Sequence, residues 1–221
     1  MNLNKKVLLA GLSAVLGLVS LDAVVTISAK AALVEQHYYA TTTRATGGLP
    51  KNTRVSVAYT TRKNGKAYVA IEASRLSYKL RKAIGNKTSL LISATAITAG
   101  KPVVSDLLPV LVKGAKFTDT ANFANQNRLK MTTNGYLELY KNKTNRAPIS
   151  STKITASRIK GTVTYLYSKT NMAKLPDKHI RKTGNYQYRL AIRDNQKQMD
   201  LSRSYSVGTL KNLFYEPTLK A

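Results

Sequence analysis

One short stretch near the middle of the N-terminal half constrains the fold more than any other part of the sequence. A run of alternating apolar and polar residues, 54–61, and a second run, KAYVAIEA at 66–73, stand on either side of Asn64-Gly65. Both of these residue types tolerate the positive φ angles of a two-residue hairpin turn. The sequence therefore predicts a β-hairpin over residues 54–73, and with it an antiparallel sheet. The alternating apolar residues of the first run are Val55, Val57 and Tyr59.

Further strands and a helix are expected along the chain. Strands are predicted at 88–98, 136–140, 162–167 and 186–192, where Val, Ile, Thr, Leu and Tyr are dense. Residues 74–84 change period, with Leu76, Leu80 and Ile84 at four-residue spacing, which favours a short helix. A single helical turn is possible at 171–177, while 153–160 and the last thirty residues predict no definite element.

These elements predict the fold class and a division of the chain. We expect a β-rich α+β protein of antiparallel sheets with one or two short helices, after a cleaved signal helix. Residues 113–134 are polar and irregular, and form a possible linker between a β-rich half at 32–112 and another at 135–221. Pro109 argues against a central strand in the apolar run that precedes this stretch.

Residues 1–31 have the pattern of a secretory signal peptide. Two lysines precede the uncharged run 7–21, and Ala29-Lys30-Ala31 fits the small-x-small site that signal peptidase requires. A retained membrane anchor is the alternative, but the uncharged run ends at Asp22 and is shorter than the roughly 20 apolar residues that span a bilayer. We therefore expect cleavage after Ala31 and no stable membrane span in the mature chain.

The charge of the chain constrains its partners. There are 36 Lys and Arg against 10 Asp and Glu, a formal charge of +26, and loss of the signal leaves 33 against 9, or +24. Such an excess favours contact with polyanions, and export favours the phosphate-rich polymers of a Gram-positive wall over nucleic acid. No nucleic-acid partner is expected. The chain has no cysteine, so a buried core and not disulfides must hold the fold.

The basic residues are grouped, and tyrosines stand beside several groups. A tyrosine ring packs on the apolar face of a sugar while a neighbouring cation meets phosphate. The residues predicted to bind polyanions are Arg62, Lys63, Lys66, Lys79, Arg81, Lys82, Lys141, Lys143, Arg158, Lys160, Lys178, Arg181, Lys182 and Arg189. The residues predicted to stack on sugars are Tyr140, Tyr165, Tyr167, Tyr186 and Tyr188. For any one of them, a solvated basic face or a half-buried strand tyrosine is the competing interpretation.

The sequence predicts no catalytic site, no metal site and no cofactor. His37 and His179 are the only histidines, and the nine acids of the mature chain are scattered without local pairs. Asp177 and His179 could join a serine in a triad, but no Gly-x-Ser-x-Gly turn is present to place one. A solvated loop histidine is the favoured interpretation.

Three segments carry a resemblance to a known family. They read LYKNKTNRAP from Leu139, TYLYSKTNMAKL from Thr164 and GNYQYRLAI from Gly184. With the signal, the absence of cysteine and the high charge, they resemble the surface-layer (S-layer) and related cell-envelope proteins of lactobacilli. The resemblance implies non-covalent binding to wall polysaccharide or teichoic acid through a basic β-domain.

The predicted function is a secreted, non-enzymatic protein of the cell wall or cell surface of a Gram-positive bacterium, bound to anionic wall polymers. S-layer subunits and host glycans are further possible partners. Two alternatives stay open: an adhesin that uses the same surface on host mucin or matrix, and a secreted hydrolase or bacteriocin-like protein.

Overall fold

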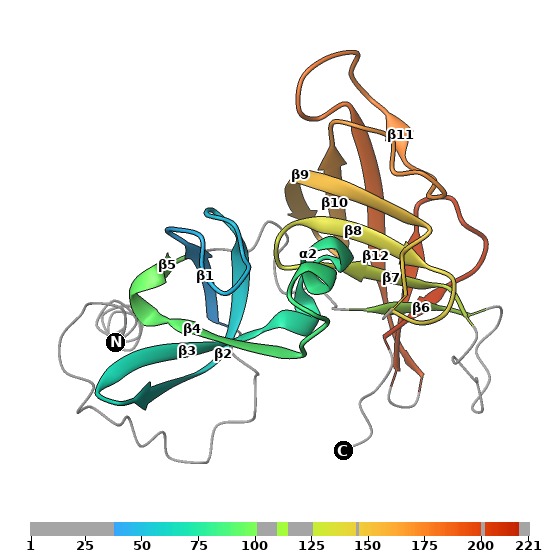
Figure 1. Cartoon of the computed structure of the whole chain (residues 1–221). Coiled ribbons are helices and arrows are strands. Elements are labelled where there is room, and N and C mark those ends of the chain that lie inside the picture. Colours follow the sequence, from blue (N-terminus) through green and yellow to red (C-terminus); the bar gives the residue numbers. More distant parts are fainter. Residues whose placement is uncertain (1–37, 101–109, 115–125, 145, 200–201, 217–221) are drawn as a thin grey trace, which may run out of the picture. The chain divides into compact units, whose positions relative to one another are not determined.

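The computed structural model describes residues 38–100, 110–114, 126–144, 146–199 and 202–216, which form two antiparallel β-sheets (Figure 1). Both sheets belong to one compact unit that begins at Tyr39. The predicted signal peptide, His37 and Pro109 lie outside the described residues. The chain is β-rich, as predicted, and its described helices are one α-helix and two short 3-10 turns.

The N-terminal sheet has five strands in the order β4-β3-β2-β1-β5. Its elements are β1 (Tyr38–Thr42), β2 (Arg54–Lys63), β3 (Lys66–Glu72), η1 (Ala73–Arg75), α2 (Tyr78–Ala83), β4 (Ser89–Ser93), η2 (Ala94–Ala96) and β5 (Ile97–Ala99).

The predicted hairpin is confirmed as β2 and β3. Lys63 pairs with Lys66 across the turn, and Asn64 and Gly65 have φ angles of 50° and 71°. The register shifts between Val57, which pairs with Ile71, and Tyr59, which pairs with Ala70. This β-bulge turns Tyr59 to the opposite face from Val57, so the expected alternation ends there.

The predicted helix over 74–84 is split into η1 and α2. Ser77 between them is extended, with φ −61° and ψ 152°, and its N–H bonds to the Asn134 side chain and not to a helical carbonyl. The apolar side of the predicted helix is nevertheless the buried one, because Leu76 and Ile84 belong to the core. The predicted strand at 88–98 is likewise divided, into β4 and β5, by η2.

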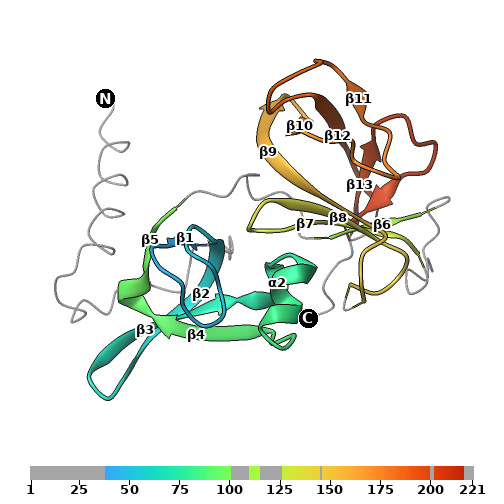
Figure 2. The same ribbon diagram turned by 45° about the horizontal axis from the view of Figure 1, so that its top comes forward.

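The second sheet closes into a barrel of eight antiparallel strands (Figure 2). The strands follow the order β10-β9-β8-β7-β6-β14-β13-β12, and β12 pairs back with β10. They are β6 (Leu111–Lys113), β7 (Arg128–Met131), β8 (Tyr136–Tyr140), β9 (Ser150–Lys160), β10 (Val163–Ser168), β12 (Tyr188–Met199), β13 (Ser202–Val207) and β14 (Phe214–Tyr215). The two-residue strand β11 (Lys178–His179) pairs with the start of β12. Closure leaves the barrel without open edges.

The division of the chain differs from the expected one. Strand β7 lies inside the predicted linker 113–134 and pairs with β6 and β8, so residues 128–131 of this stretch are part of the barrel. The change from one sheet to the other falls between β5 and β6. The polar character of 126–134 reflects barrel residues that bond to the N-terminal sheet, as described below.

Each sheet has its own apolar core. The N-terminal core is built around Leu49, Val55, Ile71 and Leu76. The barrel interior holds a separate cluster that includes Leu129, Leu137, Ile154, Leu166, Leu190 and Phe214. Among the described residues, no helix has the length and apolar character needed to span a bilayer.

Candidate polyanion-binding face of the barrel

Strands β9, β10, β11 and β12 bring many of the predicted site residues to one outer surface. Along β10 and β12, Leu166, Leu190 and Ile192 are buried in the barrel core. The residues that alternate with them, such as Tyr167 and Arg189, are half-buried and point outward. This alternation follows from the two-residue period of a strand whose one face is buried. We call this surface the barrel face and define it by Arg158, Tyr165, Tyr167, Lys178, Tyr186 and Arg189.

The strand register places these residues in two neighbouring rows. Arg158 of β9 pairs with Tyr165 of β10. In the next row, Tyr167 of β10 pairs with Arg189 of β12, which in turn pairs with Lys178 of β11. Directly paired side chains of adjacent strands stand side by side on one face. Each row therefore places a tyrosine ring directly beside a cation.

Ring contacts fix several of these side chains. The Arg189 guanidinium carbon lies 5.1 Å from the centroid of the Tyr165 ring, within the range of a cation–π contact. The rings of Tyr167 and Tyr186 meet edge to face, with centroids 5.8 Å apart and an interplanar angle of 74°. A guanidinium held over a ring keeps its N–H edge available to an anion.

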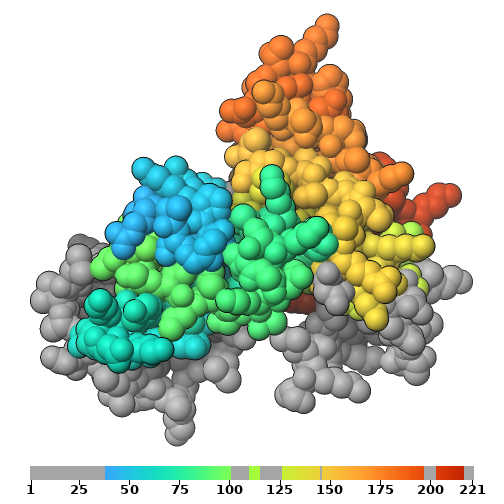
Figure 3. All heavy atoms as spheres, in the orientation of Figure 1, coloured from blue at the N-terminus to red at the C-terminus, as the bar shows by residue number. Residues whose placement is uncertain are grey.

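The loop between β11 and β12 carries Tyr186 and two more predicted cations, Arg181 and Lys182. It projects beyond the barrel strands (Figure 3). The Thr155 hydroxyl donates to the Asn185 carbonyl at 2.6 Å and ties the loop to β9. The Ile180 N–H also donates to the Gln187 carbonyl at 2.7 Å. These bonds give the exposed loop a defined position next to the barrel face.

The electrostatic environment of the barrel face is one-sided. Residues 150–192 contain nine Lys and Arg and a single acid, Asp177. That carboxylate accepts from the Met172 N–H at 2.7 Å and from the Asn171 amide at 3.0 Å, so it closes its own turn. Within the described part of the chain, no carboxylate pairs with Arg158, Lys178 or Arg189. The cations of this surface are left available for an outside anion.

The two residues considered for a triad are used otherwise. Asp177 is engaged by the turn, which closes with a Leu175 N–H to Met172 carbonyl bond and replaces the expected helical turn. The His179 ring lies on the ring of Tyr188, with centroids 4.9 Å apart. In the residues that the structure describes, no group of His, Asp and Glu forms a candidate metal site.

Two predicted site residues are buried and cannot contact a polymer. Tyr140 is 0% exposed and Arg81 is 7% exposed. The Arg81 Nη2 donates to the Tyr140 hydroxyl at 2.8 Å and to the Thr144 carbonyl at 2.7 Å. The Tyr140 hydroxyl donates to Glu138 Oε2 at 2.5 Å. Burial and the hydrogen bond to Glu138 raise the pKa of Tyr140. Both predictions are corrected here: this pair belongs to an internal network.

The other predicted cations lie on exposed surface away from the barrel face. Arg62, Lys63 and Lys66 form the tip of the β2–β3 hairpin. Lys79 and Lys82 are exposed on α2, and Lys141 and Lys143 follow β8. Lys160, at the end of β9, is exposed beside the barrel face. Tyr188 is half-buried beneath His179.

A polar junction, which the sequence did not predict, links the two sheets. Glu138 accepts from the Tyr78 N–H at 2.8 Å, and the Asn134 side chain exchanges two hydrogen bonds with Ser77, of 2.8 and 2.9 Å. Lys130 donates to the Ser74 carbonyl. Burial, and next the charge of Arg81, lowers the pKa of Lys130 to about 7. These barrel residues are spaced four apart along a hairpin, but nothing in a single sequence reveals that they face another sheet.

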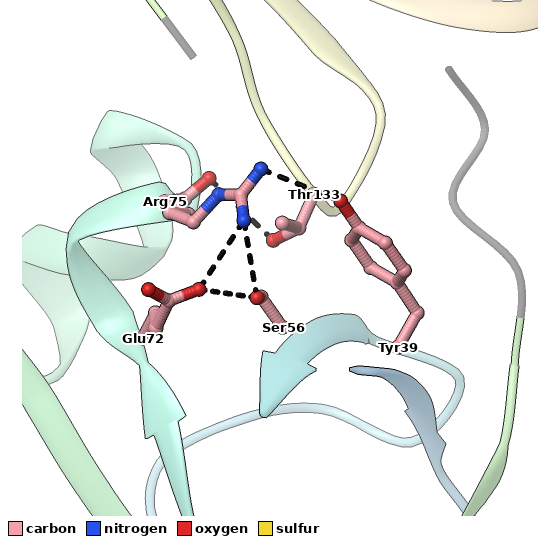
Figure 4. Close-up of polar contacts among 5 residues, drawn as sticks. All are labelled: Tyr39, Ser56, Glu72, Arg75 and Thr133. Carbon is pink, nitrogen blue, oxygen red and sulfur yellow. Dashed lines mark hydrogen bonds and ion pairs between the residues drawn. The ribbon is translucent and has the colours of Figure 1, made fainter. Parts of the chain in front are cut away.

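Arg75 extends the junction on the side of the N-terminal sheet (Figure 4). Its Nη1 lies 3.3 Å from both Glu72 Oε2 and Ser56 Oγ, and the Ser56 hydroxyl donates to the same carboxylate. Its Nη2 lies 3.4 Å from the Tyr39 hydroxyl, and its carbonyl accepts from the Thr133 N–H at 3.0 Å. Arg75 thus organises polar groups of the sheet while its backbone holds the β7–β8 turn.

Comparison of the chain with protein-family models, with curated proteins and with solved structures finds no match.

Proposed function

We propose that this protein binds anionic cell-wall polymers, non-covalently and without catalysis, through the barrel face. The observation that carries the proposal is the side-by-side placement of cations and tyrosines on β9, β10, β11 and β12. Arg189 is held over Tyr165, and no described carboxylate pairs with Arg158, Lys178 or Arg189.

The chemistry of the surface suits a polymer of sugars or polyols joined by phosphates. Guanidinium groups bind phosphate with paired N–H donors, and their hydrogen bonds to anions are stronger than those between neutral groups. The exposed Tyr186 ring, in edge contact with Tyr167, offers an apolar face on which a sugar can pack. Contacts repeated over two rows match a ligand with regularly spaced charges.

The place of action that we propose is the cell surface of a Gram-positive bacterium. Support comes from the charged start of the chain, the uncharged run 7–21 and the Ala29-Lys30-Ala31 triplet, which together fit a cleaved export signal. The resemblance of 139–192 to wall-binding segments of S-layer and related proteins points to the same class of ligand.

The test is sedimentation of residues 32–221 with purified Gram-positive walls, before and after the teichoic acid is extracted. We expect binding to intact walls that falls steeply with salt, because each phosphate contact releases a counterion. A variant with Arg158→Gln and Arg189→Gln should bind about tenfold or more weakly, since it loses two charge-assisted contacts. Lys51→Gln with Lys87→Gln removes the same charge from exposed sites elsewhere and should stay near wild type.

Three results would count against the proposal. Equal binding to walls with and without teichoic acid would make another wall component the ligand. Equal weakening in both double variants would mean that net charge, and not the barrel face, controls binding. Binding of mucin but not of walls by the wild type would favour the adhesin.

A further inference from the structure

The β2–β3 hairpin forms a second basic projection, on the other sheet. Strand β4 pairs with β3 only from Tyr68 to Glu72, so the tip from Arg62 to Ala67 has no partner strand on that side. Figure 1 shows this tip extending past its neighbours in the sheet. The Asn64-Gly65 turn, with both φ angles positive, keeps the tip tightly closed.

The charge of the hairpin is also one-sided. Residues 54–71 contain four cations and no acid, and the cations at the tip, Arg62, Lys63 and Lys66, are all exposed. The first carboxylate after this run is Glu72, which is already held by Ser56 and Arg75. The tip therefore presents three cations without an internal counter-charge in its own hairpin.

An aromatic surface adjoins the tip on one face of the sheet. Ala70 pairs with Tyr59 on one side and with Leu91 on the other, so these three residues form one row across β2, β3 and β4. Tyr59 is 59% exposed and Leu91 is 44% exposed. The next row holds Tyr68, between polar neighbours. The β-bulge before Tyr59 is what brings its ring to this face.

From this arrangement we propose that the hairpin is a second binding site for the anionic wall polymer, so that one molecule holds a single long chain at two places. The inference rests on the proposed function. The hairpin belongs to the N-terminal sheet, whose core is a different cluster from that of the barrel, so the two sites lie on different sheets of one compact unit. Once one site is occupied, a polymer long enough to reach the other binds there at high effective concentration.

A polymer fits this surface better than a lipid bilayer does. Bilayer insertion requires a continuous apolar face, but the rows here contain Thr61 and Ser93 and only two exposed large apolar residues. Cations at a projecting tip, next to a tyrosine ring, repeat the chemistry of the barrel face. The same ligand therefore satisfies both surfaces.

The experiment compares a short and a long phosphate chain on the mature protein, residues 32–221. The probes are tripolyphosphate and long-chain inorganic polyphosphate, with affinities expressed per phosphate. Wild type should bind the long chain at least about tenfold more tightly than the short one, which reaches only one site. The variant R62Q/K63Q/K66Q should lose most of this preference and keep its affinity for tripolyphosphate at the barrel face.

The control and the opposing outcomes separate this inference from the proposed function. K51Q/K87Q/K211Q removes three exposed charges elsewhere and should retain the preference for the long chain. If the hairpin variant retains it too, or if it loses binding only to vesicles of anionic phospholipid, the second polymer site is wrong while the barrel face stands. If wild type binds neither probe at low salt, the proposed function itself fails.

Discussion

Lys130, Glu138 and Arg81 are charged residues that the fold takes almost entirely out of water. Their exposed fractions are 4%, 1% and 7%. A buried charge is tolerated when each of its polar atoms finds a partner, and removal of one partner then costs more than the bond itself. The network of Arg81, Tyr140, Glu138 and the backbone of α2 meets that condition.

Lys130 makes the stability of the protein depend on pH in a defined window. Its pKa falls from 10.5 to about 7 on folding, chiefly through burial, so the unfolded chain binds more protons between these values. The free energy of unfolding should therefore rise from about pH 7 to about pH 10, by at most about 1.4 kcal/mol per pH unit. Urea unfolding at pH 6.5, 8 and 9.5 measures this directly.

Lys130→Met is the variant that isolates this effect. In this variant the free energy of unfolding should rise much less between pH 7 and pH 10. The rise that remains comes from Lys153, whose pKa is lowered by burial and by Arg54. The tyrosines whose pKa is raised, Tyr140 and Tyr205, act only above pH 10, where they oppose further stabilisation. An unchanged slope in the variant would show that Lys130 is not buried as described.

Tyr140→Phe tests the corrected role of that residue. The variant removes the hydroxyl that donates to Glu138 and accepts from Arg81, and leaves both buried charges short of a partner. We expect a loss of about 1–3 kcal/mol in the free energy of unfolding and no change in wall binding. If the variant is as stable as wild type but binds walls more weakly, the original prediction that Tyr140 contacts the ligand would be correct.

Sequence reasoning at this scale succeeded for exposed residues and failed for buried charges. Arg189 and Tyr165 alternate with apolar strand residues, so their outward position follows from local pattern. Arg81 stands among other cations on a helix, and only its long-range partner, Tyr140, decides that it is buried. No local pattern carries that information.

At the scale of the elements, two turn glycines distinguish the cost of a left-handed backbone from the cost of a steric clash. Gly65 has φ 71° and open space where a Cβ would stand, whereas a Cβ on Gly208, with φ 52°, would lie 2.6 Å from Pro176 Cγ and 2.8 Å from its carbonyl oxygen. Gly65→Ala should cost about 1–2 kcal/mol, from the left-handed backbone alone. Gly208→Ala should cost clearly more, because backbone atoms must also move. Urea or thermal unfolding of the two variants measures the loss of stability in each, and equal losses would contradict this geometry.

Elements were predictable where a turn signal met a strand pattern. The hairpin follows from Asn64-Gly65, and β8 follows from Asn134-Gly135 and the clean alternation of Tyr136–Tyr140. Strand β9 was missed because Ser150–Lys160 is mostly polar, and its stability comes from pairing with both β8 and β10. The bulge at Tyr59 was missed because one extra residue in a strand leaves no mark on composition.

On the scale of the whole molecule, the described residues form two separate apolar cores, and polar bonds connect them. The bonds described above connect Ser74, Ser77, Tyr78 and Arg81 with barrel residues between Lys130 and Thr144. The sequence indicated two halves, but it placed a linker where the barrel supplies this junction. Lys130, Thr133 and Asn134 give this stretch the polar composition of a linker, but they bond to residues 74–77 of the N-terminal half.

The junction should decide whether the two cores unfold together. Asn134→Ala with Glu138→Ala removes the acceptors of the Ser77 and Tyr78 N–H groups, and leaves the Tyr140 hydroxyl without its carboxylate acceptor. The cores themselves are untouched, since neither residue belongs to them. Hydrogen exchange against urea concentration should then show β2 and β3 losing protection before β10 and β12, whereas in wild type they lose it together.

The matched control for this junction is Asn171→Ala. It deletes an amide that bonds only within its own barrel turn, to Asp177, and should leave the two sheets coupled. Joint loss of protection in the junction variant as well would mean that another contact couples the cores. The hairpin and the barrel face would then be held at a fixed spacing by contacts beyond these bonds. A fixed spacing restricts which polymer lengths can bridge the two binding surfaces.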